Sequence, residues 1–441
     1  MATVTMEKLV SLCKRRGFVY KSSEIYGGLS GAWDYGPLGV ELKNRIRDLW
    51  WKEMTQLHDN IVGLDAAIMM HPKVWEASGH MENFTDPMVD CKQCKSRFRA
   101  DNIDLEAACP VCGSKGTFTE PRDFNLMFST HMGSVKDDAD VIYLRPETAQ
   151  GIFVNFKNVL QTSRVKIPFG IAQVGKAFRN EITTKNFIFR TCEFEQMEMQ
   201  FFVRPGDDEE WFNYWKNARI AYYDKLGIRK DKLRFHKHEE KELAHYAKEA
   251  FDIEFEFPMG WQELEGIHSR TDFDLGRHQK FSGKDMRYLD PSDNSRYLPY
   301  VIETSAGLTR SVLMALSDAY DEEVLDNGET RMIMHFHPEI APITVAVFPL
   351  VKKDGIAELA KEIEKGLRDD FTTFYDQSGA IGRRYRRMDE VGTPFCITAD
   401  YQSKDDKTVT LRFRDSMEQI RVPIAELAGR IRSEIKTYKR V

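Results

Sequence analysis

The chain has 441 residues, of which 42% are hydrophobic and 30% are charged, and its formal net charge is −6. This length predicts two or three domains, each long enough to bury its own core. No run approaches the roughly 18 apolar residues that cross a bilayer, so no membrane partner is expected. The N-terminus has no signal-peptide core, and seven cysteines, four of them in one cluster, indicate a reducing compartment. We therefore expect a cytoplasmic protein.

The acidic net charge is distributed unevenly along the chain. Residues 341–441 carry 19 Lys and Arg against 16 Asp and Glu, a net of +3, which leaves 44 against 53, a net of −9, for the remainder. A locally basic region is compatible with contacts to RNA and does not demonstrate them.

Residue patterns predict helices at both ends of a strand-rich middle. The long second helix has its apolar residues on one face, whereas residues 204–258 are rich in Lys, Glu, Trp and Tyr and are predicted to be helical. The expected elements are helices over 6–16 and 38–56, strands over 141–144, 167–173, 261–265 and 300–304, a helix over 308–320, a strand over 343–348, a helix over 355–369, and strands over 394–398 and 408–414.

Two prolines within residues 335–342 mark a linker between two domains. Strands on both sides of helical segments predict an antiparallel α+β domain over residues 1–338. That domain is expected to carry one insertion at about 88–122 and a helical insertion at about 204–258. Alternating strands and helices predict a separate α/β domain over residues 339–441.

A hairpin in the strand-rich stretch gathers groups that suit a nucleoside triphosphate. Arg179 and Glu181 are two apart in an expected strand, which places both side chains on one face. After a turn over residues 182–186, the return strand places Phe194 and Glu198 on one face. Cations suit phosphates and an aromatic ring suits a base, and the chain has no glycine-rich phosphate loop. The hairpin therefore predicts a nucleotide site that relies on side chains.

Three motifs, in order, resemble those of the class II aminoacyl-tRNA synthetases. The helix over 38–56 with the strand and proline after it resembles motif 1, residues 178–194 resemble motif 2, and residues 301–310 resemble motif 3. The segment Arg145-Pro-Glu-Thr-Ala-Gln-Gly151 narrows the resemblance to the glycyl-tRNA synthetases. The resemblance implies a class II antiparallel-sheet catalytic domain, a C-terminal α/β anticodon-binding domain, and a homodimer built on motif 1. A motif 1 helix that packs only on its own core is the plainer alternative.

The activity implied by the resemblance is that of a glycine–tRNA ligase, whose partners are glycine, ATP and tRNA(Gly). The carboxylate of glycine would attack the α-phosphorus of ATP in line, expelling pyrophosphate, and glycine would then pass to the 3′ end of the tRNA. Charge builds up on the phosphoryl oxygens, so the reaction needs positioned cations and Mg²⁺. Arg179 and Arg310 are implied as catalytic, Glu263 as the Mg²⁺ carboxylate, and Gly307 as the residue that allows a close turn. The implied ATP-binding residues are Arg179, Asn180, Glu181, Phe189, Phe194, Glu263, Leu264, Gly307 and Arg310.

Glycine offers a binding site only an ammonium, a carboxylate and an α-carbon. The site must therefore fix the ammonium and leave no room for a methyl group. Clustered glutamates suit this task, because their mutual repulsion is expected to be relieved by a bound cation. Arg97 competes with Arg99 for one role, and Arg270 fits the family motif without an assigned role. The glycine-binding residues implied by the resemblance are Arg99, Glu147, Phe194, Glu198, Glu303 and Ser305.

Two Cys-X-X-Cys pairs lie in the expected insertion at 88–122. Each pair places two thiolates on one side of a tight turn, and together they complete a tetrahedral zinc shell. Four Cys ligands leave no open position, so the zinc is predicted to be structural; a redox pair is the alternative. Similar insertions occur in bacterial members of the family that the chain resembles. The four expected ligands are Cys91, Cys94, Cys109 and Cys112.

Residues 382–387 in the C-terminal domain, Gly-Arg-Arg-Tyr-Arg-Arg, combine cations with an aromatic ring. Such groups pair with phosphates and stack on unpaired bases, although a charge run is more often a solvated face. Two other functions stay open: a threonyl or prolyl relative, and a non-catalytic paralogue with a regulatory or RNA-binding role. The presence of both Arg179 and Arg310 counts against the paralogue.

Overall fold

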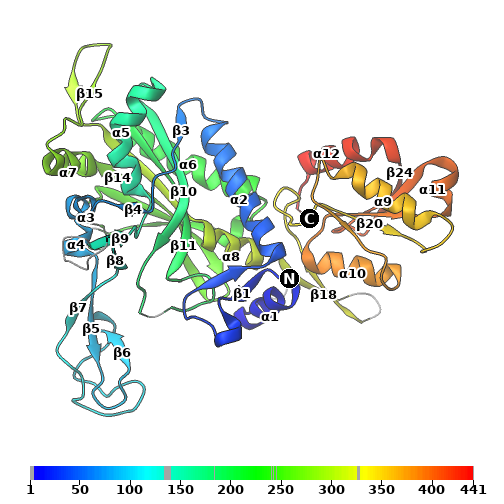
Figure 1. Ribbon diagram of the computed structural model, residues 1–441, viewed down its shortest axis with the longest axis horizontal. Helices are drawn as coiled ribbons and strands as arrows, with labels where there is room; N and C mark the ends of the chain where they lie inside the picture. Colours follow the sequence, from blue (N-terminus) through cyan, green and yellow to red (C-terminus); the bar gives the residue numbers. More distant parts are fainter. Residues whose placement is uncertain are drawn as a thin grey trace.

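A seven-stranded sheet forms the centre of the N-terminal part of the computed structural model (Figure 1). The structure describes residues 4–133, 141–182, 184–239, 241, 243–244, 246–324 and 328–440. The strand order is β12-β13-β14-β17-β11-β10-β3, and all neighbours are antiparallel except β10 and β3. The antiparallel α+β prediction is therefore confirmed. The strands are β3 (Ile61–Gly63), β10 (Phe169–Phe178), β11 (Glu193–Val203), β12 (Leu233–Lys237), β13 (Glu249–Phe257), β14 (Gly260–Thr271) and β17 (Tyr300–Gly307).

Each face of this sheet is covered by helices. Successive residues of β11 point to opposite faces, so Phe201 belongs to one core and Phe202 to the other. The first core joins the sheet to α1 (Met6–Arg16), α2 (Pro37–Thr55), α6 (Asp208–Lys225) and α8 (Leu308–Ala319). The second joins it to α5 (Ala149–Ser163) and α7 (Phe273–Ser282). The helices expected at 6–16, 38–56 and 308–320 are confirmed to within one residue at each end.

The expectation that residues 204–258 are helical is wrong for most of the segment. Only α6 is a long helix, and the segment then supplies β12 and β13 at one edge of the central sheet. The charged residues that suggested a helix form cross-strand ion pairs, such as Arg234 with Glu254 at 2.6 Å and Lys237 with Glu249 at 3.0 Å. Opposite charges on facing strand positions stabilise a sheet, so composition alone was a poor guide here.

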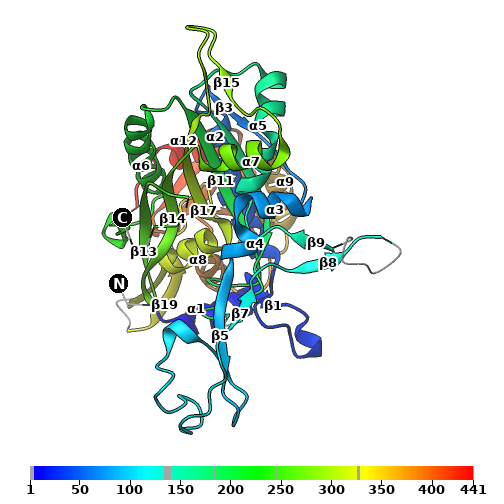
Figure 2. The same cartoon turned by 90° about the vertical axis from the view of Figure 1, so that its left-hand side faces the viewer.

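A smaller sheet projects from the main body and carries the cysteine-rich segment (Figures 1 and 2). Its strand order is β6-β5-β7, and all its pairs are antiparallel. Its strands are β5 (Thr85–Asp90), β6 (Arg97–Arg99) and β7 (Arg122–Asn125), preceded by α3 (Pro72–Ser78) and α4 (His80–Asn83). Another three-stranded sheet pairs β4 (Met69–Met70), β9 (Val141–Leu144) and β8 (Ser129–His131) at the base of this projection.

A five-stranded sheet with its own core forms the C-terminal part, on the right of Figure 1. The order β21-β20-β22-β23-β24 is mixed, because β20 is parallel to β21 and β22 while the remaining pairs are antiparallel. The α/β prediction for this region is confirmed. Its elements are β20 (Val345–Pro349), α9 (Ile356–Leu367), β21 (Thr373–Tyr375), α10 (Ile381–Val391), β22 (Phe395–Ala399), α11 (Tyr401–Asp406), β23 (Thr408–Phe413), β24 (Gln419–Pro423) and α12 (Leu427–Thr437).

Short elements complete the architecture. The hairpin of β18 and β19 lies between the two large sheets along the chain, and a second hairpin, β15 and β16, extends from the main body (Figure 1). None of the described helices combines the length and apolar character needed to cross a membrane. The remaining strands are β1 (Val19–Lys21), β2 (Trp33–Tyr35), β15 (Tyr288–Leu289), β16 (Arg296–Tyr297), β18 (Tyr320–Val324) and β19 (Thr330–Met334).

Candidate active site

A cavity of about 370 Å³ opens at one end of the central sheet, where β10 and β17 end and β11 and β14 begin. Most of the residues expected to bind ATP meet here, although they come from three strands, a loop and a helix. The cavity is lined by Arg179, Glu181, Phe189, Arg190, Thr191, Phe194, Glu195, Gln196, Gln262, Glu263, Ser305, Gly307, Thr309 and Arg310.

Arg179 lies just beyond the strand on which it was expected. Strand β10 ends at Phe178, so Arg179 and Glu181 belong to the following loop, and the same-face argument for this pair is wrong. Arg179 Nε donates to the carbonyl of Pro146 at 3.1 Å, and its guanidinium lies 5.2 Å from the ring centre of Phe194. Among the described residues, its two Nη atoms have no hydrogen-bond partner. Arg179 therefore presents free donors to the cavity.

The loop also ties Glu181 to a second arginine, Arg190. Arg190 Nε donates to Glu181 Oε2 at 2.7 Å, which closes the loop between β10 and β11. This pair fixes the shape of the loop that holds Arg179.

Arg310 occupies the first turn of α8 and faces Glu263. Its Nη1 donates to the carbonyl of Glu263 at 3.1 Å and lies 3.0 Å from Glu263 Oε2, and the charge of Arg310 lowers the pKa of Glu263. Its guanidinium also lies 4.5 Å from the ring centre of Phe189. The backbone of Gly307 at the expected close turn has a φ of −76°, which any residue can adopt, so its conformation does not require glycine. A Cβ there would come within 3.4 Å of the Arg310 side chain, so glycine provides room beside the cation.

A cluster of three carboxylates, Glu147, Glu198 and Glu303, lies beside this cavity and is called the carboxylate pocket. Strand register explains its contacts. Glu198 of β11 pairs with Ser305 of β17, and Ser305 Oγ donates to Glu198 Oε1 at 2.8 Å. Gln200 and His268 both lie opposite Glu303 in the sheet. Gln200 Nε2 donates to one oxygen of Glu303, and His268 Nδ1 bonds the other, each at 2.7 Å. Ser305 belongs to both the cavity lining and the pocket, so it joins the two.

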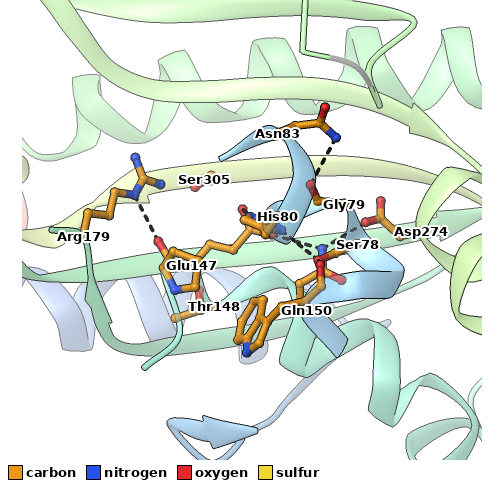
Figure 3. Close-up of polar contacts among 12 residues, drawn as sticks. Ser78, Gly79, His80, Asn83, Glu147, Thr148, Gln150, Arg179, Asp274 and Ser305 are labelled. Atoms are coloured by element: carbon orange, nitrogen blue, oxygen red, sulfur yellow. Dashed lines mark hydrogen bonds and ion pairs between the residues drawn. The ribbon is translucent and has the colours of Figure 1, made fainter. Parts of the chain in front are cut away.

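Glu147 enters the pocket from the segment before α5 (Figure 3). Gln150 Nε2 donates to Glu147 Oε1 at 3.0 Å, and His80 Nε2 lies 3.4 Å from Glu147 Oε2. The other ring nitrogen of His80 bonds Ser78 Oγ at 2.8 Å. Sequence reasoning missed His80, because no local pattern connects it with a residue so far along the chain.

Arg270 has a clear structural place that the sequence did not reveal. Its Nη1 donates to Glu303 at 3.0 Å, and its Nε and Nη2 donate to the two oxygens of Asp274 at 2.8 and 2.9 Å. The guanidinium is buried and lies 3.7 Å from the ring centre of Tyr246. The expectation that only a bound cation relieves the glutamates is therefore wrong, because the protein supplies one itself.

The three glutamates differ in their electrostatic surroundings. Burial alone would raise the pKa of Glu303, but the charge of Arg270 and the hydrogen bond from His268 lower this pKa to about 2. Burial also opposes ionisation of Glu147, yet the adjacent imidazole and the charge of Arg270 hold its pKa well below the usual range. Burial and the neighbouring charges of Glu303 and Glu147 raise the pKa of Glu198 to about 8.

Three expected site residues belong neither to the cavity lining nor to the three glutamates beside it. Leu264 is 1% exposed and belongs to the main core, so its side chain does not reach the cavity. Asn180 donates its backbone N–H to the carbonyl of Leu126 at 2.7 Å, which links the loop to the projecting sheet. Arg99 lies on that projecting sheet, 3.1 Å from Asp86.

Of the two competing arginines, Arg99 lies nearer to the cavity. Arg99 donates to Asp101 at 2.7 Å, and the charge of Glu181 contributes to the raised pKa of Arg99. Arg97 instead pairs with the exposed Asp90 at 2.7 Å.

The four clustered cysteines form a compact set of sulfur atoms. Their Sγ atoms all lie within 4.8 Å of one another, and two pairs that span the knuckles are 3.7 Å apart. A tetrahedral zinc with Zn–S bonds of about 2.3 Å requires sulfur atoms about 3.8 Å apart. The donor set and spacing thus fit zinc. The four residues are Cys91, Cys94, Cys109 and Cys112.

The two knuckles share one backbone conformation. The N–H of Lys95 donates to the carbonyl of Cys91 at 2.9 Å, and that of Gly113 donates to the carbonyl of Cys109 at 2.8 Å. Both donors have a positive φ, 61° and 72°. Each turn therefore directs its two thiols to the same side, as a shared metal requires.

The arginine-rich segment of the C-terminal domain is mostly committed to the fold. Arg384 is buried, and its Nη1 donates to a carbonyl of β20 at 2.6 Å. Arg387 pairs with Asp376, and the Tyr385 hydroxyl shares a hydrogen bond with a threonine of β22. The interpretation of the whole segment as an RNA-binding surface is therefore wrong for the buried Arg384, whereas for the partly exposed Tyr385 and Arg387 it stays a prediction. Arg383 is exposed, and within the described residues its guanidinium has no partner.

The fold and the cavity together define a class II aminoacyl-tRNA synthetase: an antiparallel sheet whose end presents an arginine loop and a second arginine on the following helix. Residues 130–319 match the family described as "tRNA synthetase class II core domain (G, H, P, S and T)", and residues 344–434 match "Anticodon binding domain". The prolyl-tRNA synthetase of Cryptosporidium parvum shares the fold with a TM-score of 0.66 at 15% identity, covering 98% of this chain and 76% of that one.

Sequence relatives narrow the class. The chain is 68% identical to the glycine–tRNA ligase of Treponema denticola over 99% of this chain and 98% of the relative. It is 62% identical to that of Borreliella burgdorferi over 99% of each. The chain belongs to the glycine–tRNA ligase family.

Proposed function

We propose that the protein activates glycine with ATP, forming glycyl-adenylate and pyrophosphate, and then transfers glycine to the 3′ end of tRNA(Gly). One observation carries this proposal. Ser305 lines the cavity that presents Arg179 and Arg310, and its hydroxyl donates to the buried carboxylate of Glu198. A triphosphate and a small ammonium compound can thus lie side by side, with the carboxylate of glycine directed at the α-phosphorus.

The arginines are assigned to the phosphates of ATP. Arg179 would bind the α-phosphate with its free Nη donors, and Arg310 would bind the distal phosphates. Phe194 would stack on adenine, held flat by the guanidinium 5.2 Å from its ring centre. Positioned cations stabilise the charge that develops in phosphoryl transfer.

Glu263 is assigned to Mg²⁺, with the ATP phosphates as further ligands. Its side chain is 51% exposed at the cavity and ionised beside Arg310, which suits a hard cation that keeps several waters. Bound there, Mg²⁺ would neutralise phosphate charge.

Glycine is assigned to the carboxylate pocket. Glu147, Glu198 and Glu303 would surround the ammonium, with Ser305 beside them. The hydrogen-bonded walls leave little freedom to accept the methyl group of alanine, and overpacking a rigid site costs about 1–3 kcal/mol. Arg99 would reach the carboxylate of glycine only by leaving Asp86, so this assignment is the least supported by the geometry.

Amino-acid-dependent exchange of labelled pyrophosphate into ATP tests the proposal. We expect exchange with glycine and none with alanine, serine, threonine or proline. Exchange driven by another amino acid would mean that the pocket is wrongly assigned. Folded protein that exchanges with none of them would favour a non-catalytic role.

Zinc is proposed as a structural ion of the projecting sheet. The test is metal analysis of purified protein, where we expect one zinc per chain. Cys109→Ser should lose the zinc and lower the unfolding temperature, whereas Cys13→Ala, a change outside the cluster, should keep one zinc per chain. Retention of zinc by Cys109→Ser would contradict the four-ligand site.

A homodimer is proposed on the basis of the family and of an exposed apolar turn. Ile25 and Tyr26 are each 87% exposed, and Leu29 is 62% exposed. Apolar side chains grouped in this way commonly mark a protein interface. One face of α2, the expected motif 1 helix, is buried in the chain's own core, so α2 alone does not account for a dimer. Light scattering should give twice the chain mass, and Tyr26→Glu should reduce it.

The remaining assignments concern organisation and location. We propose a domain boundary near residues 338 and 339, between β19 and β20, with tRNA(Gly) contacted by the domain that follows. The segment over about 88–122 is proposed as an insertion in the first domain. A cytoplasmic location is proposed because all seven cysteines are free thiols and four of them must remain reduced to bind zinc.

A further inference from the structure

We propose that glycine binding expels a proton from Glu198, so that the protein releases close to one proton for each glycine bound. This inference rests on the proposed glycine pocket and adds how the protonation of that pocket changes when glycine binds. Glu198 would be the dedicated counter-ion of the ammonium, because Glu147 and Glu303 already have partners of their own.

The pocket holds more acidic groups than the resident cation can balance. Glu147, Glu303 and Asp274 lie in one connected network of hydrogen bonds, and Arg270 is the guanidinium within it. Glu198 lies outside that network and bonds Thr148, Gln196 and Ser305, although the charges of Glu303 and Glu147 act on it. Arg270 bonds Asp274 and Glu303 directly, so the negative charge on the other carboxylates must be compensated by other groups or by protonation. When buried carboxylates lie close together, one of them commonly stays protonated, because this removes the repulsion between their charges.

Glu198 is the carboxylate with neutral partners. It accepts from Thr148 Oγ1 at 2.6 Å, from Gln196 Nε2 at 3.0 Å and from Ser305 Oγ at 2.8 Å. Both hydroxyls can rotate to accept a hydrogen bond, so they serve the protonated form of Glu198 as well as the ionised form.

The guanidinium of Arg145 also acts on Glu198, and two of its nitrogen atoms donate to other groups. Arg145 Nε donates to the carbonyl of Lys176 at 2.6 Å, and Nη1 donates to that of Ala66 at 2.8 Å. The charge of Arg145 interacts with Glu198 only at longer range, and the described residues include no ion pair between them.

The electrostatics of the pocket agree with this geometry. Glu198 is 2% exposed, and burial together with Glu303 and Glu147 raises its pKa to about 8. At neutral pH the empty pocket therefore holds Glu198 mainly in its protonated form. Other titratable groups around the pocket are His80, beside Glu147, and His268, beside Glu303. Tyr246 lies against Arg270, and His278 bonds Gln150.

The exchange balances without any further reactant. Glycine arrives as a zwitterion that already carries its ammonium. When the ammonium takes its place, the O–H bond of Glu198 breaks and the proton leaves to solvent, so the carboxylate faces the new positive charge. The carboxylate of glycine and its ammonium are unchanged by binding.

Calorimetry of glycine binding to the full-length protein at pH 7 tests the proposal directly. Titrations in phosphate and in Tris, whose ionisation enthalpies differ widely, should give different heats corresponding to release of nearly one proton. Equal heats in the two buffers would overturn the proposal while leaving the glycine site in place. Absence of both glycine binding and glycine-dependent exchange would instead overturn the proposed function.

The pH dependence supplies a second test. Below about pH 8, Glu198 must lose a proton before glycine binds, so the KM for glycine should rise by up to about tenfold per pH unit as the pH falls toward 6. Above that pH the KM should level off. The KM for ATP serves as the internal reference, and a KM for glycine that does not vary between pH 6 and 8 would contradict the proposal.

Variants identify the source of the proton. Glu198→Gln keeps the shape but holds no titratable proton, so its KM for glycine should rise at least tenfold at pH 8 and vary little with pH. Glu193→Gln, on the exposed end of β11, is the matched control and should keep the wild-type profile. His80→Gln and His268→Gln should both keep the proton release. If the proton release is lost in either histidine variant but retained in Glu198→Gln, the released proton would come from an imidazole instead.

Discussion

Two arginines of this chain, Arg179 and Arg384, are used in opposite ways. Arg179 makes one hydrogen bond, to the carbonyl of Pro146, and directs its remaining donors into a cavity. Arg384 is 4% exposed and donates to three backbone carbonyls, those of Pro349, Asp376 and Gly379. A binding site is therefore marked by donors that the fold leaves free, and the number of arginines in a segment says little about it.

The largest effect is expected at the arginine with free donors. Arg179→Gln removes a cation aimed at the α-phosphate, and loss of one such group costs about 10²–10³-fold in rate. The glycine-dependent pyrophosphate exchange rate should fall by this factor. Because Arg179 makes few contacts with the protein, the unfolding temperature should stay within a degree of wild type. If the unfolding temperature falls together with the exchange rate, Arg179 is a structural residue, as Arg384 is.

The opposite outcome is expected for the buried arginine of α10. Arg384→Met fills the volume but leaves buried carbonyls without donors, which should reduce the free energy of unfolding by about 2 kcal/mol. In thermal unfolding of the full-length protein, this loss should lower the temperature of the first unfolding transition. Pyrophosphate exchange by the folded variant should match wild type, since the active site lies on the other sheet. A reduced exchange rate in variant protein that is fully folded would show that α10 affects the catalytic cavity.

The same contrast explains what the sequence could predict about the site. The period of two residues along β11 placed Phe194 and Glu198 on one face, and both are found there. The roles of His80 and Arg270 could not be read in this way. His80 meets Glu147 only because α4 packs beside the start of α5 in the folded chain, and Arg270 meets Asp274 and Glu303 only through the packing of α7 on the sheet.

For the fold, hydrophobic periodicity was the reliable guide and composition was the misleading one. The apolar stripe of α2 placed this helix to within one residue, because burial on the core dictates both the period and the ends. The helical prediction failed at the edge strand β12 and at its neighbour β13, because both carry charged residues, and composition does not distinguish such strands from a charged helix.

The smallest effect is expected at Arg383, which belongs to the same helix as Arg384 but leaves its charge exposed. Arg383→Ala removes a cation that the described fold does not use, so the unfolding temperature and the pyrophosphate exchange rate should not change. If Arg383 contacts an RNA phosphate, the KM for tRNA(Gly) should rise a few-fold, and the slope of log affinity against log salt should fall by about 1. Arg386→Ala is the comparison, because Arg386 pairs with Glu329 at the surface of the protein. An unchanged salt slope in both variants would mean that α10 faces away from the tRNA. Arg383 would then bind no ligand, as is expected for Arg384 and in contrast to Arg179.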